Sequence, residues 1–98
     1  MAVPAPDFIS IMSAFPTGVA IVTTLDADGT PRGLTTNAVC SVSAEPPLLL
    51  VCVDRESRTL PALLHSQRFV VNFVAEGRDE LARRFASKAD DKFAGVAW

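Results

Sequence analysis

The sequence predicts a mainly β fold, a β-barrel with helical connections, built as one domain over residues 1–98. Segments rich in β-branched residues, which favour strands, outnumber segments with helical periodicity. The first two such segments are joined by Asp26-Ala27-Asp28-Gly29, a tight-turn sequence that favours antiparallel pairing. A strand–helix–strand alternation, which is typical of a doubly wound sheet, occurs only once, around residues 60–67.

The N-terminal half reads as a helix followed by a long hairpin. Asp7 is a candidate cap for a short helix that ends before Phe15-Pro16, because a residue that precedes proline is displaced from the helical region. A strand is predicted over residues 17–24 and, after the turn, a return strand over residues 32–43. Glu45-Pro46-Pro47 ends the return strand, since proline cannot donate to a β-ladder.

The next elements are a strand and a short helix. Residues 48–54 are apolar on both faces, which predicts an interior strand. Ser57 or Thr59 can cap a helix that runs to about Gln67, with Pro61 in its first turn.

The last predicted elements are another strand and helix. Residues 69–74 form the strand, and residues 77–87 an amphipathic helix with Leu81, Ala82 and Phe85 on one side.

Composition and charge exclude several classes of function. Nine Lys and Arg against eleven Asp and Glu give a net charge of −2, unlike the basic footprint of a nucleic-acid-binding protein. The longest apolar run, residues 48–53, is far shorter than the ~20 residues that span a membrane. The N-terminus has no basic region ahead of an apolar stretch, so we expect no signal peptide. A hydrophobic content of 49% in a short chain requires a partner chain, a ligand pocket or further sequence to cover it.

Cys40 and Cys52 lie in apolar segments, with neither a CxxC motif nor a paired histidine. We interpret both as buried thiols in a reducing cytoplasm and expect no metal site. A disulfide between them would need a cross-strand geometry that a sequence does not reveal. His65 is interpreted as packing or facing water, and no catalytic residue is assigned, because no hydrolytic triad, Walker loop or GxGxxG motif is present.

The return strand carries an unusual polar face. If side chains alternate, one face holds mostly small apolar residues. The other face carries Thr35, Asn37, Val39, Ser41 and Ser43. A solvated sheet face is one interpretation, but such faces usually include Lys, Glu or Arg. The pattern also fits the uncharged polar edge of a heterocyclic ligand.

The segment over residues 54–59 leads into a helix start, where backbone N–H groups and the helix dipole favour an anion. Hydroxyls at Ser57 and Thr59, with Arg55 and Arg58 close in sequence, can hold a phosphate. The alternative is ordinary capping with solvated arginines. Solvation is also the simpler interpretation of a later basic cluster, formed by Arg83, Arg84, Lys88 and Lys92.

A series of short motifs runs along essentially the whole chain. They are F-P-T-G-V-A-I-V-T-T (15–24), G-L-T-T-N-A-V-C-S-V-S (33–43), E-P-P-L-L-L-V-C-V-D (45–54), S-x-T (57–59), F-V-V-N (69–72), L-A-R-R-F-A (81–86) and D-K-F (91–93). In this order they resemble the short-chain flavin reductase family. The resemblance implies an FMN-binding split barrel, a homodimer, and hydride transfer from NADH or NADPH to FMN or FAD. It also implies a flavin-dependent monooxygenase partner that receives the reduced flavin.

The resemblance further implies which residues hold the flavin. Residues on the return strand are expected to face the isoalloxazine ring or to lie near it. Residues of the 54–59 segment are expected to lie along the ribityl and phosphate side of the flavin. Residues of the last helix are expected to form a third contact with the flavin. The positions are Thr35, Asn37, Ala38, Ser41, Ser43, Asp54, Ser57, Thr59, Arg84, Phe85 and Ala86. The hydride chemistry belongs to the cofactor, so the lack of an acid–base pair does not argue against this activity.

One departure from the family separates the hypotheses. Members continue beyond the D-K-F motif with further strands and a Gly-Asp-His motif implicated in the nicotinamide site. This chain ends at Trp98 without that motif, so we expect it to lack the C-terminal part of the family's domain. The alternatives are a flavin-binding module or truncated remnant without reductase turnover, and a structural dimerisation module. The sequence does not distinguish FMN from FAD, or NADH from NADPH.

Overall fold

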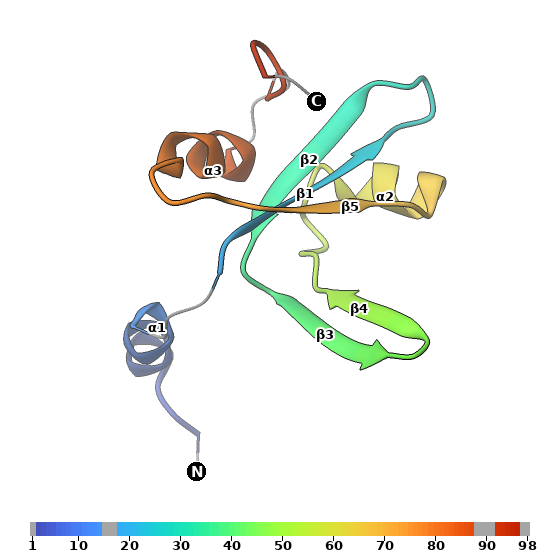
Figure 1. The fold of residues 1–98 in the computed structure, drawn as a ribbon. Coiled ribbons are helices and arrows are strands. Elements are labelled where there is room, and N and C mark those ends of the chain that lie inside the picture. Colours follow the sequence, from blue (N-terminus) through green and yellow to red (C-terminus); the bar gives the residue numbers. More distant parts are fainter. Residues whose placement is uncertain (1, 15–17, 88–91, 97–98) are drawn as a thin grey trace.

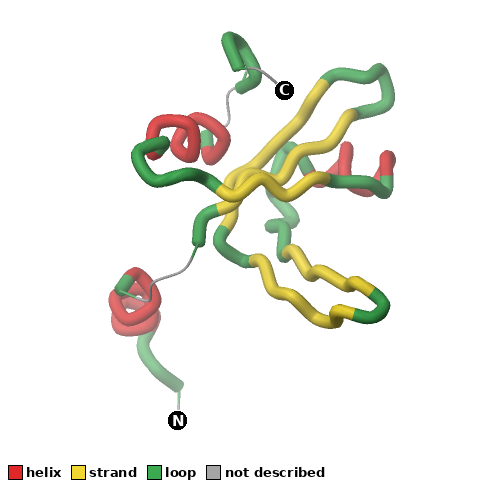
Figure 2. Tube along the Cα trace, in the orientation of Figure 1, coloured by secondary structure: helices red, strands yellow, loops and turns green. Residues whose placement is uncertain are grey.

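The computed structural model describes residues 2–14, 18–87 and 92–96. Its elements, in order, are α1 (Ala5–Ser13), β1 (Ala20–Leu25), β2 (Pro31–Thr36), β3 (Val39–Ala44), β4 (Pro47–Val51), α2 (Leu60–Ser66), β5 (Val70–Phe73) and α3 (Asp79–Ala86). A three-stranded antiparallel sheet has the order β2-β1-β5, and β3 and β4 form a separate antiparallel pair (Figures 1 and 2). The prediction of a mainly β, antiparallel fold is confirmed, and the two sheets are not closed into a barrel within the described residues.

The three-stranded sheet is covered by one helix on each face. Thr35 pairs with Ile21, and its hydroxyl donates to the Ala82 carbonyl of α3 over 2.5 Å. On the alternate face, the Thr24 hydroxyl donates to the Arg68 carbonyl over 2.7 Å, next to Ser66 of α2. Because side chains alternate along β1, α3 and α2 lie on opposite faces of the sheet.

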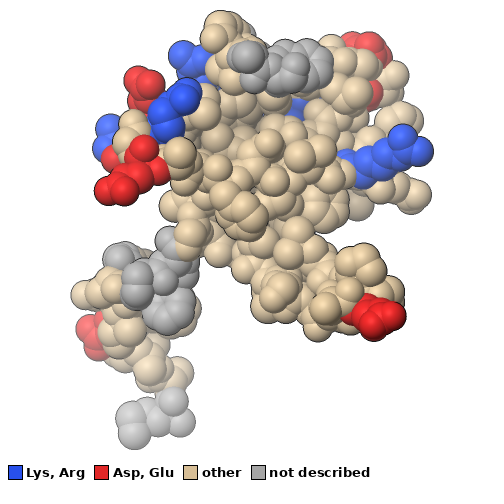
Figure 3. Space-filling model, viewed as in Figure 1, with Lys and Arg blue, Asp and Glu red and all other residues tan. Residues whose placement is uncertain are grey.

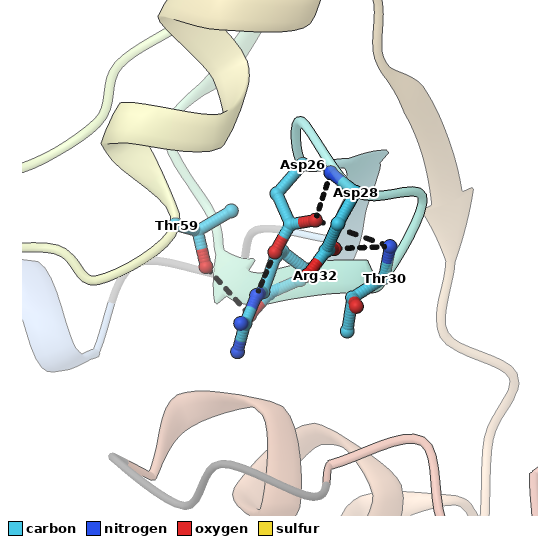
Figure 4. A network of polar contacts seen from close by, with 6 residues as sticks. Asp26, Asp28, Thr30, Arg32 and Thr59 are labelled. Carbon is cyan, nitrogen blue, oxygen red and sulfur yellow. Dashed lines mark hydrogen bonds and ion pairs between the residues drawn. The ribbon is translucent and has the colours of Figure 1, made fainter.

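The β1–β2 hairpin has the turn chemistry that its sequence predicts. The Asp26 Oδ1 atom accepts hydrogen bonds from the backbone N–H groups of Asp28 and Thr30 at 3.2 and 3.1 Å (Figure 4). Gly29 has a φ of +84°, which a residue with a side chain rarely adopts. Arg32 Nε donates to Asp26 Oδ2 over 2.9 Å, which holds the turn against the start of β2. The interaction with Asp26, and secondly with Thr30, lowers the pKa of Asp28 to about 2.

The predicted continuous return strand is wrong, because it divides into β2 and β3. Asn37 forms a bend in which the Ala38 N–H donates to the Thr36 hydroxyl over 2.9 Å, and β3 then leaves the first sheet. The polar face predicted over residues 35–43 is therefore not one continuous surface.

A β-bulge also separates two residues that were expected to share a face. Ser41 pairs with Leu49, whereas Ser43 pairs with Leu48, so one residue between the two serines is extra. Leu48 and Leu49 are consecutive on β4, so their side chains point to opposite faces of the hairpin. The side chains of their partners, Ser43 and Ser41, therefore also point to opposite faces.

The predicted interior strand is wrong as well. β4 ends at Val51 and pairs only with β3 among the described residues, in a hairpin that projects from the rest of the fold (Figure 1). Its leucines, Leu48 to Leu50, are about half exposed because no described element covers either face. The prediction of buried thiols is wrong, because Cys40 and Cys52 are free and both are exposed.

The helices follow the predictions more closely. α1 ends before Phe15-Pro16 as expected, but Pro4 takes the cap position and Asp7 lies in the first turn. α2 follows Thr59, which occupies the N-cap position but makes no side-chain capping hydrogen bond, because its hydroxyl donates to the Gly33 carbonyl. Pro61 lies in the first turn as expected. His65 on α2 is exposed, which agrees with the interpretation that it faces water rather than packs.

The sequence also predicted the position and the packed side of the last helix. In α3, Phe85 is buried and Leu81 and Ala82 are half-buried, which confirms the amphipathic assignment. β1 begins at Ala20 rather than at Thr17, which lies outside the described residues. Among the helices in the described part of the chain, none is long and apolar enough to cross a membrane.

Candidate functional site

A cavity of about 460 Å³ opens between β2, the loop that follows β4, and the C-terminal end of α3. We call it the β2–α3 cavity, and its volume falls within the range of about 300–1,000 Å³ that is typical of cofactor sites. Its walls combine apolar groups, short hydroxyl side chains and charges of both signs. The lining residues are Leu34, Thr35, Thr36, Cys52, Val53, Asp54, Glu56, Ser57, Arg58, Phe85, Ala86, Ser87 and Lys92. Two further cavities, of about 420 and 460 Å³, are lined mainly by apolar side chains.

Close packing between β2 and α3 forms one wall of the β2–α3 cavity. The Phe85 ring is 2% exposed and contacts Phe93 edge-on, with the ring centroids 4.8 Å apart. It fits against β2 only because Gly33 has no side chain: a Cβ there would lie 2.8 Å from the ring. The Thr35–Ala82 hydrogen bond holds the strand and the helix together beside this contact.

The loop after β4 is held in shape by its own hydrogen bonds. Asp54 accepts from the Glu56 N–H at its side chain and from the Ser57 N–H at its carbonyl, over 2.8 and 3.0 Å. The Ser57 Oγ atom accepts from the Thr59 N–H over 3.2 Å. These bonds place Asp54 and Ser57 on the cavity wall.

Thr59 attaches this loop to β2. The residue is 3% exposed, and its hydroxyl donates to the Gly33 carbonyl over 2.9 Å (Figure 4). The residue thus lies beneath the cavity and is not among its lining residues.

Lys92 contacts the same Gly33 carbonyl as Thr59. Lys92 Nζ donates to the Gly33 carbonyl over 2.8 Å and to the Phe85 carbonyl over 2.9 Å. Burial, and secondly the nearby charge of Arg58, lower the pKa of Lys92. Three segments that are distant in sequence therefore meet at one backbone carbonyl.

The structure brings together five of the eleven residues that the family resemblance implied. Thr35, Asp54, Ser57, Phe85 and Ala86 all line the β2–α3 cavity. The five come from three separate segments of the sequence, so the fold makes one site out of motifs that are up to 51 residues apart.

The other implied residues lie outside this lining. Asn37 and Ala38 lie in the bend after β2, and the two serines of β3 lie on the projecting hairpin. Arg84 is exposed and donates from Nη1 to the Ala94 carbonyl over 2.7 Å. A flavin contact stays a prediction for all eleven residues, whether or not they line the cavity.

Two charged residues that line the cavity, Glu56 and Lys92, are not among the site residues predicted from the sequence. Glu56 carries no signal of its own in the sequence, and the sequence interpretation places Lys92 in a solvated basic cluster, of which Lys88 lies outside the described residues. Lys92 belongs to the D-K-F motif, and that motif was the available signal. Of the two arginines in the loop after β4, Arg58 lines the cavity and Arg55 does not. Within the described residues, no cluster of three or more His, Cys, Asp and Glu is positioned to hold a metal ion.

The fold and the cavity define a β-sheet domain with a cofactor-sized site between strand and helix. Residues 12–98 match the family described as "Flavin reductase like domain", and the chain belongs to that family.

Relatives and solved structures agree with this assignment. The chain is 55% identical over 91 residues to "Flavin reductase (NADH)" of Kitasatospora aureofaciens, a match that covers 93% of this chain and 48% of that protein. It is 45% identical over 97 residues to "Flavin reductase (NADPH)" of Lentzea aerocolonigenes, covering 98% of this chain and 56% of that protein. The structure of nitrilotriacetate monooxygenase component B from Mycobacterium thermoresistibile superposes with a TM-score of 0.87 at 38% identity, covering 95% of this chain and 51% of that one. The chain thus spans about half the length of these relatives.

Proposed function

We propose that this chain is the N-terminal and central part of an NAD(P)H:flavin oxidoreductase that supplies reduced flavin to a flavin-dependent monooxygenase. The observation that carries the proposal is the β2–α3 cavity, which lies inside the region that matches the flavin reductase family. The names of the relatives support the reaction, since two are flavin reductases and one is a component of a monooxygenase.

The residues of the cavity fit a flavin. A flavin has a flat aromatic ring system with a polar edge, a hydroxylated ribityl chain and, in FMN and FAD, an anionic end. Leu34, Val53 and Phe85 supply apolar wall for a ring, and Thr35 and Ser57 supply hydroxyl groups beside it. This combination of apolar area with a few fixed polar groups is what small-molecule sites use for affinity and orientation.

The chain's own residues have a binding and orienting role in this proposal. Thr35 is fixed by the hydrogen bond that its hydroxyl donates to α3, so the two lone pairs of its oxygen present an acceptor at a defined position. Phe85 excludes water from the wall because its ring is almost fully buried. Asp54 presents a carboxylate that suits the hydroxyls of a ribityl chain. A bound FMN or FAD would supply the hydride chemistry by accepting a hydride from NADH or NADPH.

We further propose that the protein works as a homodimer in the cytoplasm. The β3–β4 hairpin supports the dimer, because Val42, Leu48, Leu49 and Leu50 are exposed on it. Figure 3 shows this hairpin without charge except at its tip, as expected of a surface that another chain covers. The two free thiols, Cys40 and Cys52, fit a reducing compartment. Light scattering after size exclusion tests the dimer: Leu49→Glu should shift the chain towards monomer, whereas a mass of one chain without the substitution contradicts it.

A flavin-binding module without reductase turnover is the second candidate. His65, the chain's single histidine, lies on α2 and does not line the β2–α3 cavity, so it does not substitute for the family's nicotinamide-site motif.

Two measurements on the purified chain separate the candidates. Flavin fluorescence titrated with protein reports binding, and the fall in NADH or NADPH absorbance with added flavin reports turnover. We expect saturable flavin binding with flavin-dependent oxidation of the nicotinamide. Binding without oxidation favours the second candidate, and failure to bind FMN or FAD at micromolar concentration contradicts both.

A further inference from the structure

The hydroxyl of Thr59 forms a bond that is unusual for its position in the chain. Thr59 precedes α2, where a threonine side chain normally accepts a hydrogen bond from an N–H of the first helical turn. It makes no such cap, and its hydroxyl donates instead to the carbonyl of Gly33, which is 26 residues away in sequence (Figure 4). The bond therefore joins the loop after β4 to β2 at the expense of a helix cap.

The Gly33 carbonyl joins the three segments that surround the β2–α3 cavity. It accepts from the Thr59 hydroxyl over 2.9 Å and from Lys92 Nζ over 2.8 Å, and these two donors match the two lone pairs of a carbonyl oxygen. We call this arrangement the Gly33 junction. Neither Gly33 nor Thr59 is among the lining residues of the cavity, so the junction lies beneath its wall.

The two ends of the Thr59–Gly33 bond lie close in sequence to hydroxyl groups of the cavity wall. Thr35 follows Gly33 on β2 by two residues, and Ser57 precedes Thr59 by two residues; both line the cavity. The Thr59 N–H also donates to the Ser57 Oγ atom over 3.2 Å, which fixes that side chain. The bond between Thr59 and Gly33 therefore sets the position of Ser57 relative to Thr35.

Thr59 is placed to act on the cavity from beneath rather than to contact a ligand in it. The residue is 3% exposed. It does line a neighbouring cavity of about 30 Å³, but that is about the volume of one water molecule and is too small for a flavin. A side chain in this position affects binding through order, because a wall that is already fixed loses little conformational freedom when a ligand binds.

We propose that Thr59 is a positioning residue for flavin binding, whose hydroxyl holds Ser57 in place relative to Thr35 without contacting the flavin. The proposal rests on the proposed function, because it concerns the same cavity. It replaces the direct flavin contact that the family resemblance implies for Thr59. A positioning role predicts that loss of the hydroxyl weakens binding of every flavin alike, whether or not the flavin carries a phosphate.

The test measures the affinity of the full chain for riboflavin and for FMN, which differ only in the phosphate, by quenching of flavin fluorescence. Thr59→Val keeps the shape of the side chain and removes the hydroxyl, while the Gly33 carbonyl keeps its bond from Lys92. We expect both flavins to bind about 3- to 10-fold more weakly, the range that corresponds to the loss of one neutral hydrogen bond. Thr59→Ser keeps the hydroxyl and should bind both flavins within about 2-fold of the original chain.

Thr24→Val separates positioning from a general loss of stability. Thr24 is also buried, at 9% exposure, and its hydroxyl donates to the Arg68 carbonyl over 2.7 Å. This bond lies on the face of the sheet opposite α3, and Thr24 does not line the β2–α3 cavity. Urea denaturation should show a comparable loss of stability in Thr24→Val and Thr59→Val, whereas flavin affinity should fall in Thr59→Val and stay unchanged in Thr24→Val.

Amide hydrogen exchange in the original chain tests the same idea without a substitution, even if Thr59→Val does not fold. The N–H groups of Ser57 and Leu60 donate to the carbonyls of Asp54 and Ser57, and the N–H of Thr59 donates to the Ser57 Oγ atom. We expect these amides to be protected in the free chain and to gain little protection with saturating riboflavin. Protection that arises only with riboflavin would show that the ligand orders the loop, which rejects positioning by Thr59.

The other outcomes overturn the proposal in distinguishable ways. Unchanged affinity in Thr59→Val, or an equal loss of affinity in Thr24→Val, rejects a positioning role. A loss for FMN without a loss for riboflavin means that Thr59 contacts the phosphate directly. Weak binding by Thr59→Ser assigns the effect to the methyl group rather than to the hydroxyl. If the original chain binds neither flavin, the proposed function itself fails, and the positioning role fails with it.

Discussion

Gly33→Ala tests whether the close contact between β2 and α3 forms the wall of the cavity. The added Cβ would lie 2.8 and 2.9 Å from two carbons of the Phe85 ring and 3.3 Å from the Val22 carbonyl. Real Cβ atoms do not approach so closely, so the ring or the strand must shift. The ring has little freedom, because it is 2% exposed and packs edge-on against Phe93.

The change in the free energy of unfolding on Gly33→Ala is the sum of two opposing contributions. Overpacking a well-filled site costs about 1–3 kcal/mol. Replacing glycine within a strand by alanine otherwise stabilises by about 0.5–1 kcal/mol, because the unfolded chain loses freedom. Gly33 does not have a positive φ, so backbone strain adds nothing. We expect Gly33→Ala to lower the free energy of unfolding by about 1–2 kcal/mol.

Urea denaturation followed by far-ultraviolet circular dichroism measures this change. Gly18→Ala is the matched control, because a Cβ there meets nothing within 4 Å, and it should change stability by no more than about 0.5 kcal/mol. In a Phe85→Leu background the smaller side chain makes room, and the cost of Gly33→Ala should disappear. An equal cost in both backgrounds, or no cost in either, would refute the reasoning about this contact.

Three other predictions concern single side chains. Thr59→Val removes the buried hydrogen bond to Gly33 and should cost about 1–2 kcal/mol in urea denaturation, whereas Thr59→Ser keeps the hydroxyl and most of the stability. Since the pKa of Asp28 is about 2 in the folded chain against 3.8 ordinarily, its carboxylate stabilises the fold above about pH 4, and this contribution is lost as the pH falls towards 2. A carboxyl NMR titration checks the midpoint, and a value near 4 contradicts the turn network. Asn37→Leu should weaken flavin binding in a chain that still folds, and unchanged affinity removes Asn37 from the site.

Local patterns in the sequence account for the elements that were predicted correctly. The β1–β2 turn depends on Asp26 and Gly29, which act within five residues, and the amphipathic side of α3 depends on helical spacing ending at Phe85. Such features need no knowledge of the rest of the chain. The five residues that the resemblance implied and that line the cavity came from family motifs rather than from these patterns.

The errors concern tertiary structure. Nothing local marks the bend at Asn37, the extra residue in β3, or the exposure of β4, because each depends on where the second sheet lies relative to the first. Lys92 was missed for a similar reason: its partners are backbone carbonyls of Gly33 and Phe85, and a carbonyl has no signature in sequence.

A crystal structure of the chain soaked with FMN shows whether the β2–α3 cavity is the flavin site. Electron density for the flavin ring is expected beside Thr35 and Phe85. Density for FMN in another place, such as the apolar cavity between Ile21 and Leu81, would contradict it.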